Sequence, residues 1–313
     1  MLENGNMLYL YAETPFHPGS GGSLGYVDLP VQREVHTRFP VFQASGLKGV
    51  LRETALACSN SKDHVNLIFG PEDGAEHAGC ISVGDARILL FPVRSLMGVF
   101  AWVTCPMVIQ RLLRDYAAAF TSPPDIKCSE VKEGYALVCS GSALIISEGQ
   151  ANKPGGRIVL EEYDFAAISN DAETDILARW IADNVIPESP EYEKWRERIK
   201  LQLAIVSDDA FTTFVNFNTM VVTRTQLDDI KKVVKTGALW TEENLPPDTV
   251  LYAPVFASKP RKENKDNKIP PDIITAKGVL NWMQQNIKGR VIAGGDSTVG
   301  RGILCTRWQG GVQ

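Results

Sequence analysis

One stretch near the amino end brings together backbone N–H donors, a carboxylate and a guanidinium, the groups that phosphate binding and acid–base chemistry use. Residues 19–34 read GSGGSLGYVDLPVQRE, with Asp28 ahead of Arg33. His17 and His36 flank the stretch and are rival bases, because imidazole titrates near neutral pH. The residue types leave three roles open: a phosphate cradle, a catalytic carboxylate or a flexible connection.

The named nucleotide-binding motifs do not fit this glycine-rich run. GSGGSLG lacks the G-K-[ST] ending of a Walker loop. Gly19 and Gly21 begin like a Rossmann fingerprint, but Leu24 stands where the third glycine belongs. On pattern alone the run is more typical of a turn than of a ligand site.

A second glycine loop, GGDSTVGRG at residues 294–302, fails the same two tests. Thr298 and Arg301 stand among its glycines, which include Gly295 and Gly300. Backbone donors combined with a hydroxyl and a guanidinium suit a phosphodiester chain. The composition of this loop therefore favours a role in nucleic-acid binding over a plain turn.

A helix with a basic row is predicted over residues 45–58, with Ser45 as its N-cap. Apolar residues recur four apart on one face, and Lys48 and Arg52 form a second row. This row is either a solvated face or a phosphate contact near the positive amino end of the helix. Glycine lets another backbone approach closely, and the two glycines beside this row are Gly46 and Gly49.

The remaining elements follow from hydrophobic period and turn signals. The sequence predicts strands over 7–14, 290–294 and 303–308, short strands between 81 and 105, and a helix that begins at Pro106. It also predicts helices over 172–184, 190–205 and 271–287, an insertion loop over 58–79 and a lysine-rich surface loop over 258–272. A projecting hairpin has arms centred on Met220–Thr225 and Lys232–Val234.

Two ligand types that zinc accepts occur in the predicted insertion loop. They are Cys58, His64, His77 and Cys80. Their spacing is unlike that of common zinc fingers, so a structural zinc stands as an alternative to ordinary loop and core residues. The six cysteines include no C-x-x-C pair, which argues against a disulfide framework or a redox motif.

Composition indicates one elaborated globular domain of 313 residues, with 44% hydrophobic and 22% charged residues. No apolar stretch is long enough to cross a bilayer and the start lacks signal-peptide features, so we expect a cytoplasmic protein without a membrane partner. The net charge of −5 hides segregated charge, because residues 161–193 hold ten acidic side chains against one arginine, whereas residues 30–52 and 288–308 are each basic. Such segregation permits a basic groove on an acidic protein.

Four segments together resemble the RAMP superfamily of CRISPR proteins. They are the glycine-rich loop before Asp28, the S-x-x-K-G-x-x-R helix at 45–52, DARILLFPVRSLMGVFAWVTCP at 85–106 and the terminal GGDSTVGRG. The similarity runs along nearly the whole chain. The glycine loop marks the superfamily, whereas the 85–106 segment is more specific to the repeated backbone subunit of the type III-B, or Cmr, effector complex.

The resemblance implies an α+β fold in one RAMP domain over residues 1–313. We expect a ferredoxin-like, RRM-related core with an insertion at about 58–80, a helical insertion at about 157–206 and a projecting thumb β-hairpin within about 207–245. It also implies that several copies stack in a filament along one guide crRNA, beside other Cmr-complex subunits, and that complementary target RNA is cleaved.

The resemblance assigns the cutting to Asp28 with a divalent metal, Mg²⁺ or Mn²⁺. A single carboxylate cannot build a two-metal cage, so we expect one loosely held ion completed by water and RNA phosphate. Asp28 either ligates that ion or accepts the 2′-OH proton through a water molecule. The residues expected to contact RNA are Ser45, Gly46, Lys48, Gly49, Arg52, Met220, Val221, Arg224, Gly295, Thr298, Gly300 and Arg301.

Two other functions fit the same residues. One is a guide-RNA-binding scaffold subunit in which Asp28 is inert. The other is a standalone guide-processing ribonuclease, for which a histidine is expected to lead the chemistry. Met220, Val221 and Arg224 are either ordinary strand residues or thumb residues that wedge into the guide–target duplex.

Overall fold

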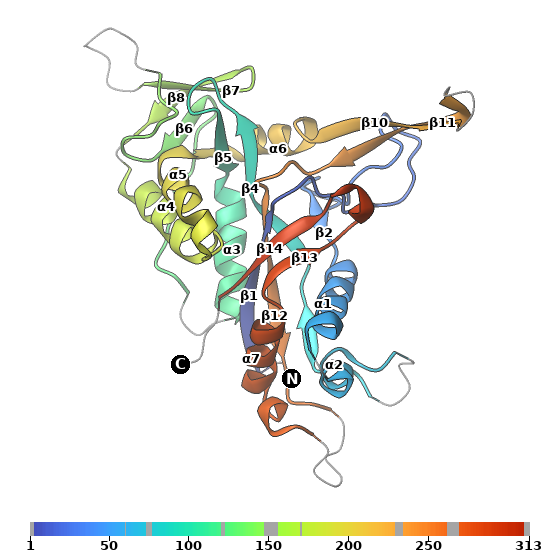
Figure 1. Cartoon of the computed structure of the whole chain (residues 1–313). Helices are drawn as coiled ribbons and strands as arrows, with labels where there is room; N and C mark the ends of the chain where they lie inside the picture. Colours follow the sequence, from blue (N-terminus) through green and yellow to red (C-terminus); the bar gives the residue numbers. More distant parts are fainter. Residues whose placement is uncertain are drawn as a thin grey trace.

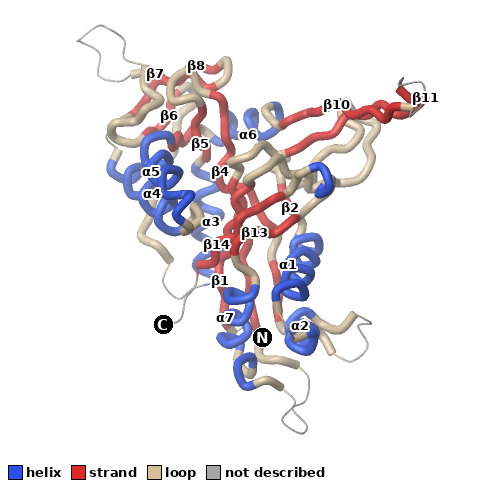
Figure 2. The backbone as a smooth tube through the Cα atoms, viewed as in Figure 1, coloured by secondary structure: helices blue, strands red, loops and turns tan. Residues whose placement is uncertain are grey.

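A computed structural model of the chain describes residues 3–59, 61–72, 77–119, 123–146, 156–169, 171–228, 234–261 and 269–309. One mixed sheet runs through the molecule with the strand order β13-β14-β1-β12-β4-β5-β9-β6-β8-β7, and a separate hairpin pairs β10 with β11 (Figure 1). Helices pack beside this sheet, so the predicted α+β class is confirmed (Figure 2).

The first half of the sheet, called the palm sheet below, is antiparallel at every neighbouring pair. Its strands are β13 (Gly289–Ile292), β14 (Ile303–Gln309), β1 (Asn4–Ala12), β12 (Val250–Ala257) and β4 (Ala86–Arg94). Short strands β2 (Val41–Phe42) and β3 (Ile81–Val83) pair with β4 and β12. The terminal strands predicted from sequence are therefore present.

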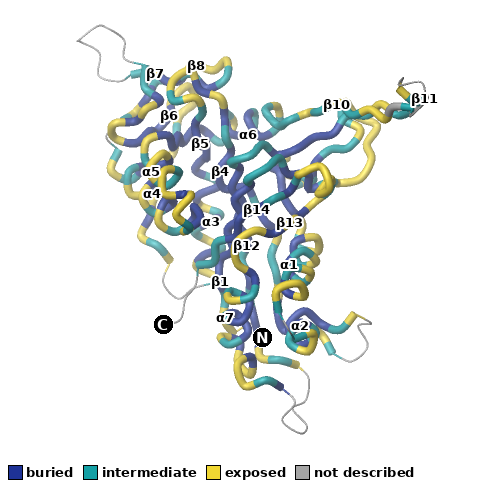
Figure 3. Tube along the Cα trace, viewed as in Figure 1, coloured by how far each residue is buried: buried dark blue, intermediate teal, exposed yellow. Residues whose placement is uncertain are grey.

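Both faces of the palm sheet are buried, which explains why β1 is apolar at almost every position. Met7 and Tyr9 enter one core, and Leu8 and Leu10 enter the other. Helix α3 (Pro106–Ala119) packs on the first face, while α1 (Ala44–Cys58) and α7 (Ala276–Asn286) pack on the second. The buried residues follow these central strands (Figure 3).

The second half of the sheet, called the head below, corrects the expected helical insertion. Its strands are β5 (Phe100–Thr104), β9 (Leu203–Val206), β6 (Tyr135–Val138), β8 (Tyr163–Ile168) and β7 (Arg157–Leu160). Its helices are α4 (Ala172–Asn184), η1 (Pro190–Tyr192) and α5 (Glu193–Gln202). The helix predicted over 190–205 ends before residues 203–206, whose four buried apolar residues form a strand parallel to β5.

The projecting hairpin is present, and we call it the thumb. It follows α6 (Asp208–Phe217) and consists of β10 (Met220–Leu227) and β11 (Val234–Asn244), which extend away from the palm sheet (Figure 1). The second arm is longer than predicted and begins at Val234. Residues 229–233, which include Lys232 from the predicted centre of that arm, lie outside the described residues.

Two local predictions on the α1 side were wrong. The expected loop over 58–79 contains helix α2 (Lys62–Phe69), which Ser61 caps at its amino end. The N-cap of α1 is Gln43 rather than Ser45, and the Ala44 amide donates instead to the Asp85 carboxylate, 2.8 Å away, from the turn before β4. A cap supplied by a distant loop leaves no signal in the helix sequence.

Two short 3-10 turns, η3 (Pro271–Ile273) and η4 (Ser297–Val299), flank α7 and its following strand. Within the described ranges, no helix is long and apolar enough to span a membrane. All six cysteines are free, and most are buried.

Candidate functional site

Asp28 lies exposed on the long loop between β1 and β2, residues 13–40, which runs beside the thumb (Figure 1). Its Oδ2 accepts hydrogen bonds from the backbone N of Thr241, at 2.7 Å, and from its Oγ1, at 2.8 Å. Next to it, the Leu29 amide donates to the Thr241 carbonyl, and the Glu243 amide donates to the Leu29 carbonyl. This part of the loop therefore pairs with β11, and the pairing places Asp28 beside Thr241.

These contacts set the charge of Asp28. Hydrogen bonds from the Thr241 backbone and side chain hold the pKa of Asp28 below its usual range, because they favour the ionised form. Among the described residues, no side chain or backbone donor is recorded for its other oxygen, Oδ1. Asp28 is thus an ionised carboxylate with one oxygen fixed and the other available.

A buried ion pair joins the loop to the base of the thumb. The Arg33 guanidinium donates to Oε1 of Glu243 at 2.5 Å, and both side chains are less than 10% exposed, at 8% and 7%. Oε2 of Glu243 accepts from the Val31 amide and Oε1 from the Thr219 hydroxyl. Arg33 also donates to the Val215 carbonyl on α6. Loop, thumb and α6 are therefore fixed to one another beneath Asp28.

His17 is used inside the protein. It is 8% exposed, and its Nδ1 lies 2.6 Å from the Glu243 carbonyl oxygen, to which it donates. A Cβ on Gly19 would lie 2.5 Å from its Nε2, so the loop covers that nitrogen. The ring therefore supports the loop and is not exposed as a base.

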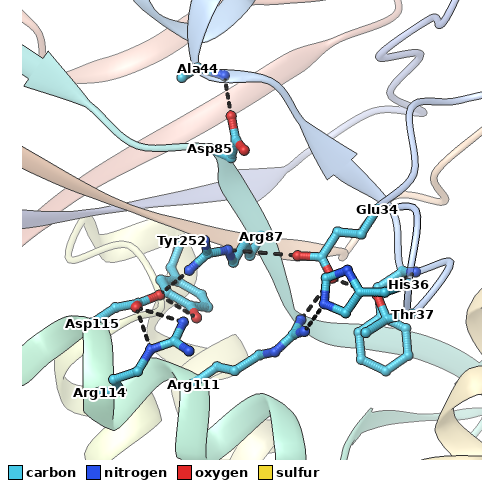
Figure 4. Close-up of polar contacts among 11 residues, drawn as sticks. Glu34, His36, Thr37, Ala44, Asp85, Arg87, Arg111, Arg114, Asp115 and Tyr252 are labelled. Carbon is cyan, nitrogen blue, oxygen red and sulfur yellow. Dashed lines mark hydrogen bonds and ion pairs between the residues drawn. The ribbon is translucent and has the colours of Figure 1, made fainter.

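The second half of the loop is anchored by a polar network on β4 and α3 (Figure 4). Arg111 donates to Glu34 at 2.8 Å and to Nε2 of His36 at 2.9 Å. Arg87 lies 3.7 Å from Glu34 and forms an ion pair with Asp115. Because arginine can only donate, His36 uses Nε2 as an acceptor on the α3 side of the loop.

The glycine loop over 294–302 packs directly on the Asp28 loop. The Gly295 amide donates to the His17 carbonyl, and the Gly302 amide donates to the Pro15 carbonyl. A Cβ on Gly302, whose φ is 72°, would lie 1.8 Å from a backbone carbonyl oxygen, so a larger residue does not fit there. The predicted loop thus reaches the candidate site through backbone contacts.

One exposed side of this glycine loop is suited to an anion. Thr298 and Gly300 are exposed, and Gly300 adopts φ 78°. Nε of Arg301 is buried and has no hydrogen-bond partner. An unpaired buried guanidinium N–H is costly, so Arg301 is the residue of this loop that would be stabilised most by an additional acceptor.

A family model of the RAMP superfamily matches residues 9–305. This chain belongs to the RAMP superfamily. The chain is 36% identical over 301 residues to the CRISPR system Cmr endoribonuclease Cmr4 of Pyrococcus furiosus, with 94% of this chain and 92% of the relative covered. It is 25% identical over 317 residues to the CRISPR system CMR subunit Cmr4 of Saccharolobus solfataricus, covering 96% and 95% of the two chains.

Solved structures have the same fold. An oligomeric Cmr4 from Pyrococcus furiosus superposes with a TM-score of 0.71 at 30% identity, with 99% of each chain covered. A chain of a type III-B Cmr-beta complex bound to cognate target RNA gives a TM-score of 0.72 at 20% identity, covering 98% of each chain. The second likeness concerns the fold alone.

In this RAMP protein, the α1 residues expected to contact RNA have different environments. Ser45, Gly46 and Gly49 are exposed and Lys48 is half-buried. Arg52 instead donates to Oδ1 of Asn66 at 2.9 Å and to the Gly70 carbonyl, so its guanidinium is engaged in holding α2.

The thumb residues expected to contact RNA also divide. Val221 is exposed and Met220 half-buried on β10. Arg224 lies between two carboxylates, at 3.0 Å from Glu242 and 3.1 Å from Asp296. Burial raises the pKa of the Glu242 carboxyl, while the pKa of Asp296 is held below its usual range by its contact with Glu242 and by Arg224. This cluster connects the thumb to the glycine loop.

The candidate site around Asp28 includes residues that the sequence pattern does not single out. Thr241 positions Asp28, and Glu243 pairs with Arg33 beneath it. One signal was available: Glu242 and Glu243 are adjacent acidic residues within a β-rich arm. Carboxylates are rarely buried without partners, so this pair indicated a polar network at the base of the thumb.

The four residues of the zinc alternative are not gathered around one point. Cys80 is buried, and burial raises the pKa of its thiol to about 11, whereas Cys58 is exposed. His64 lies 2.6 Å from the Ser61 hydroxyl and 3.2 Å from Asp272. In the part of the chain that the structure describes, no three His, Cys, Asp or Glu side chains are placed to share a metal ion.

Proposed function

We propose that this RAMP protein is a backbone subunit of a type III-B (Cmr) CRISPR ribonucleoprotein that binds guide crRNA and cleaves complementary target RNA endonucleolytically. The observation that carries the proposal is the ionised carboxylate of Asp28, fixed to the thumb by Thr241. The Pyrococcus relative named a Cmr endoribonuclease, at 36% identity over almost the whole chain, supports the activity. The oligomeric structure of that relative supports a filament of several copies.

We propose a ferredoxin-like palm as the platform for this site. Strands β1, β4, β12 and β14 follow one another along the chain but lie in the spatial order β14-β1-β12-β4. Helix α1 follows β1 and α7 follows β12, and both pack in the same core. This order supports the proposed palm, because ferredoxin-like and RRM-related folds are built from two split βαβ units.

The chemistry needs few protein groups because RNA carries its own nucleophile in the 2′-OH. An enzyme has to hold that oxygen in line with the leaving oxygen and manage proton and charge. Thr241 orients Asp28, and the Arg33–Glu243 pair fixes the loop against the thumb, where a distorted target strand would lie. The low pKa of Asp28 makes it a weak base and favours a role as a ligand or electrostatic group.

A divalent metal fits these residues as a partner of Asp28 and RNA together. Asp28 is exposed and its Oδ2 alone is bound by Thr241, and no further acidic or imidazole ligands are gathered around it among the described residues. Bound Mg²⁺ or Mn²⁺ would neutralise phosphate charge and acidify a bound oxygen. Water and RNA phosphates would complete such a coordination shell.

Guide RNA phosphates are proposed to lie over the glycine loop and the amino end of α1. The half-buried Arg301 and the exposed Thr298 and Gly300 lie on one side. Lys48, with Ser45, Gly46 and Gly49, supplies a cation beside an open helix start. Arg52 and Arg224 contribute through the geometry of α2 and the thumb, because both are already engaged within the chain.

The alternative of a standalone guide-processing ribonuclease has less support. Such an enzyme is expected to use a histidine, yet His17 is buried against Glu243 and His36 is bound to Arg111. The scaffold alternative differs from the proposal only in whether Asp28 acts. One experiment therefore separates them.

The test is cleavage of a labelled complementary RNA by the assembled complex containing Asp28→Ala. We expect a loss of about 100-fold or more, the scale of a positioned catalytic group, with unchanged target binding. Asp125→Ala is the matched control, because Asp125 is also an exposed loop aspartate. Undiminished cutting by the Asp28 variant would refute the assignment of cleavage to Asp28.

A further inference from the structure

A cavity of about 230 Å³ lies in the head where β8 meets α6. Its apolar walls include Tyr163, Phe165 and Phe214. The Tyr163 and Phe165 rings lie 5.7 Å and 6.3 Å from the Phe214 ring, so each is held in place by a neighbour. A cavity of this size is smaller than typical small-molecule sites and matches a single long side chain.

The polar lining of this cavity is acidic. Glu133, Asp164 and Asp209 line it, and among the residues that the structure describes no lysine or arginine does. Arg157 pairs with Asp164, but within the described ranges no ion pair or side-chain hydrogen bond is recorded for the carboxylates of Glu133 and Asp209. Carboxylates beside aromatic faces attract a guanidinium or ammonium group and repel the phosphates of RNA. The chemistry therefore selects a cationic protein side chain.

The same chain carries a cationic segment at its other end. Lys259 and Arg261 are exposed just after β12, and the sequence continues as KENKDNK over residues 262–268, which lie outside the described residues. In Figure 1 the chain that follows β12 leaves the bottom of the palm, beside α7, whereas β8 and α6 lie at the top. Lys259 and Arg261, which directly follow β12, therefore lie at the opposite end of the molecule from the cavity.

We propose that the head cavity receives the Lys259–Arg261 segment of the next copy in a head-to-tail stack. The inference rests on the proposed function, in which copies stack along one guide crRNA. A heterologous contact of this kind uses two different surfaces of each copy and repeats without closing, which is the geometry of a filament. Arg261 enters between the aromatic faces and pairs with Glu133 and Asp209.

Charge reversal tests the pairing. One variant carries Glu133→Lys with Asp209→Lys, and the other carries Lys259→Glu with Arg261→Glu. All four side chains are exposed in the single chain, so folding is checked by Tm. The control for the first variant, Glu162→Lys with Glu197→Lys, makes the same charge change as that variant at exposed positions outside the cavity.

Sedimentation velocity of each protein with a guide crRNA long enough for several copies gives the number of copies bound. Each reversed variant alone should assemble at least tenfold more weakly than the wild type and the control. An equimolar mixture of the two should regain assembly, because every contact between alternating copies then pairs opposite charges. Assembly at the wild-type level by either variant alone would overturn the proposal. A mixture of the two variants that does not assemble would also overturn it and would indicate that the cavity binds another partner.

Target cleavage measured on the same samples keeps this test separate from the proposed function. A wild-type protein that neither retains guide crRNA nor cuts would refute the proposed function. If the wild-type protein cuts and the charge-reversed variants assemble as well as it does, only the head-to-tail contact is refuted.

Discussion

Asp28 is distinguished from an ordinary turn aspartate by its partner and not by its sequence neighbours. Ser23 donates its amide to the Asp28 carbonyl, as in many turns, but the carboxylate reaches Thr241, which is 213 residues away along the chain. That contact fixes the rotamer of Asp28 and keeps it ionised. Thr241 is therefore a positioning residue for the proposed cleavage.

Thr241→Val tests this role. The variant keeps the backbone N–H bond to Asp28 but removes the Oγ1 bond of 2.8 Å, so we expect about tenfold slower single-turnover cleavage with unchanged target affinity. The pKa of Asp28 is lowered in the wild type, so its ionised form persists until the pH falls through that lowered value. In the variant, activity should begin to fall at higher pH.

Thr241→Ser is the control, because it restores the hydroxyl and should restore both rate and pH profile. A Thr241→Val enzyme with wild-type rate and pH dependence would show that Asp28 needs no help from the thumb.

At this scale the sequence identified cationic residues but not their partners. Lys48, Arg52 and Arg224 were grouped by charge, yet Arg52 binds Asn66 and Arg224 binds Glu242 and Asp296. Those partners come from other elements, so spacing within one helix or strand carries no trace of them. Asp28 itself was selected through family resemblance, because its local pattern is that of a turn.

Helix α1 has an exposed start, which we propose contacts RNA, and a middle that anchors α2 through Arg52. Two substitutions should separate these roles. Lys48→Ala should weaken guide retention and reduce the salt dependence of binding by about one unit of slope, because one phosphate contact is lost. Arg52→Ala should instead cost about 1–3 kcal/mol of unfolding free energy, because the Asn66 side chain and Gly70 carbonyl lose a charged donor.

Guide affinity measured across a salt series and chemical denaturation give the two readouts. An Arg52 variant with wild-type stability and a reduced salt dependence of guide binding would indicate that Arg52 contacts RNA and does not anchor α2.

The Arg33–Glu243 pair is the strongest candidate for holding loop and thumb together. Arg33→Ala would leave the buried Glu243 carboxylate without its cation, and we expect a loss of about 3–5 kcal/mol in unfolding free energy, as for other broken buried pairs. Arg179→Ala on the exposed side of α4 is the control and should change stability by less than about 0.5 kcal/mol. Equal stability of the two variants in urea denaturation would contradict the assigned role of the pair.

Helices and strands were predicted correctly where the periodic pattern of apolar residues was long, and they were missed where the apolar segment was short. The periodic segments that became α1, α3 and α7 were recognised, whereas the eight residues of α2 fell in a region rich in polar and turn residues. Residues 203–206 continue directly from α5, and a short apolar run does not reveal whether it is a helix end or a buried strand. Pairing with β5 decides that it is a strand.

On the scale of the whole molecule, two hydrophobic cores share one sheet, and alternate residues of β1 enter each core. The head continues the same sheet as the palm, and the Asp28 loop and the glycine loop connect strands of the palm. Sequence reasoning obtained the α+β class and the thumb through resemblance along nearly the whole chain. It described the head as helical because an acidic, helix-rich stretch hid strands β7, β8 and β9, whose partners lie elsewhere in the sequence.

Metal removal should affect catalysis and folding differently in this molecule. A structural zinc contributes its binding energy to folding and needs thiolate or imidazole ligands around one point. Cys80 is buried whereas Cys58 is exposed, and no three such ligands are gathered around one point within the described residues. EDTA should therefore abolish target cleavage while shifting Tm by less than about 2 °C, which corresponds to no more than about 1 kcal/mol for a chain of this size.

Restoring Mg²⁺ or Mn²⁺ should then return cleavage, since Asp28 keeps an available oxygen whether or not metal is present. A fall of many degrees in Tm on chelation would instead reveal a metal that holds the fold together, and Cys58→Ser with Cys80→Ser would locate it. Because Asp28 lies on a loop tied to the thumb by hydrogen bonds and a buried ion pair, the geometry of the proposed site does not depend on bound metal.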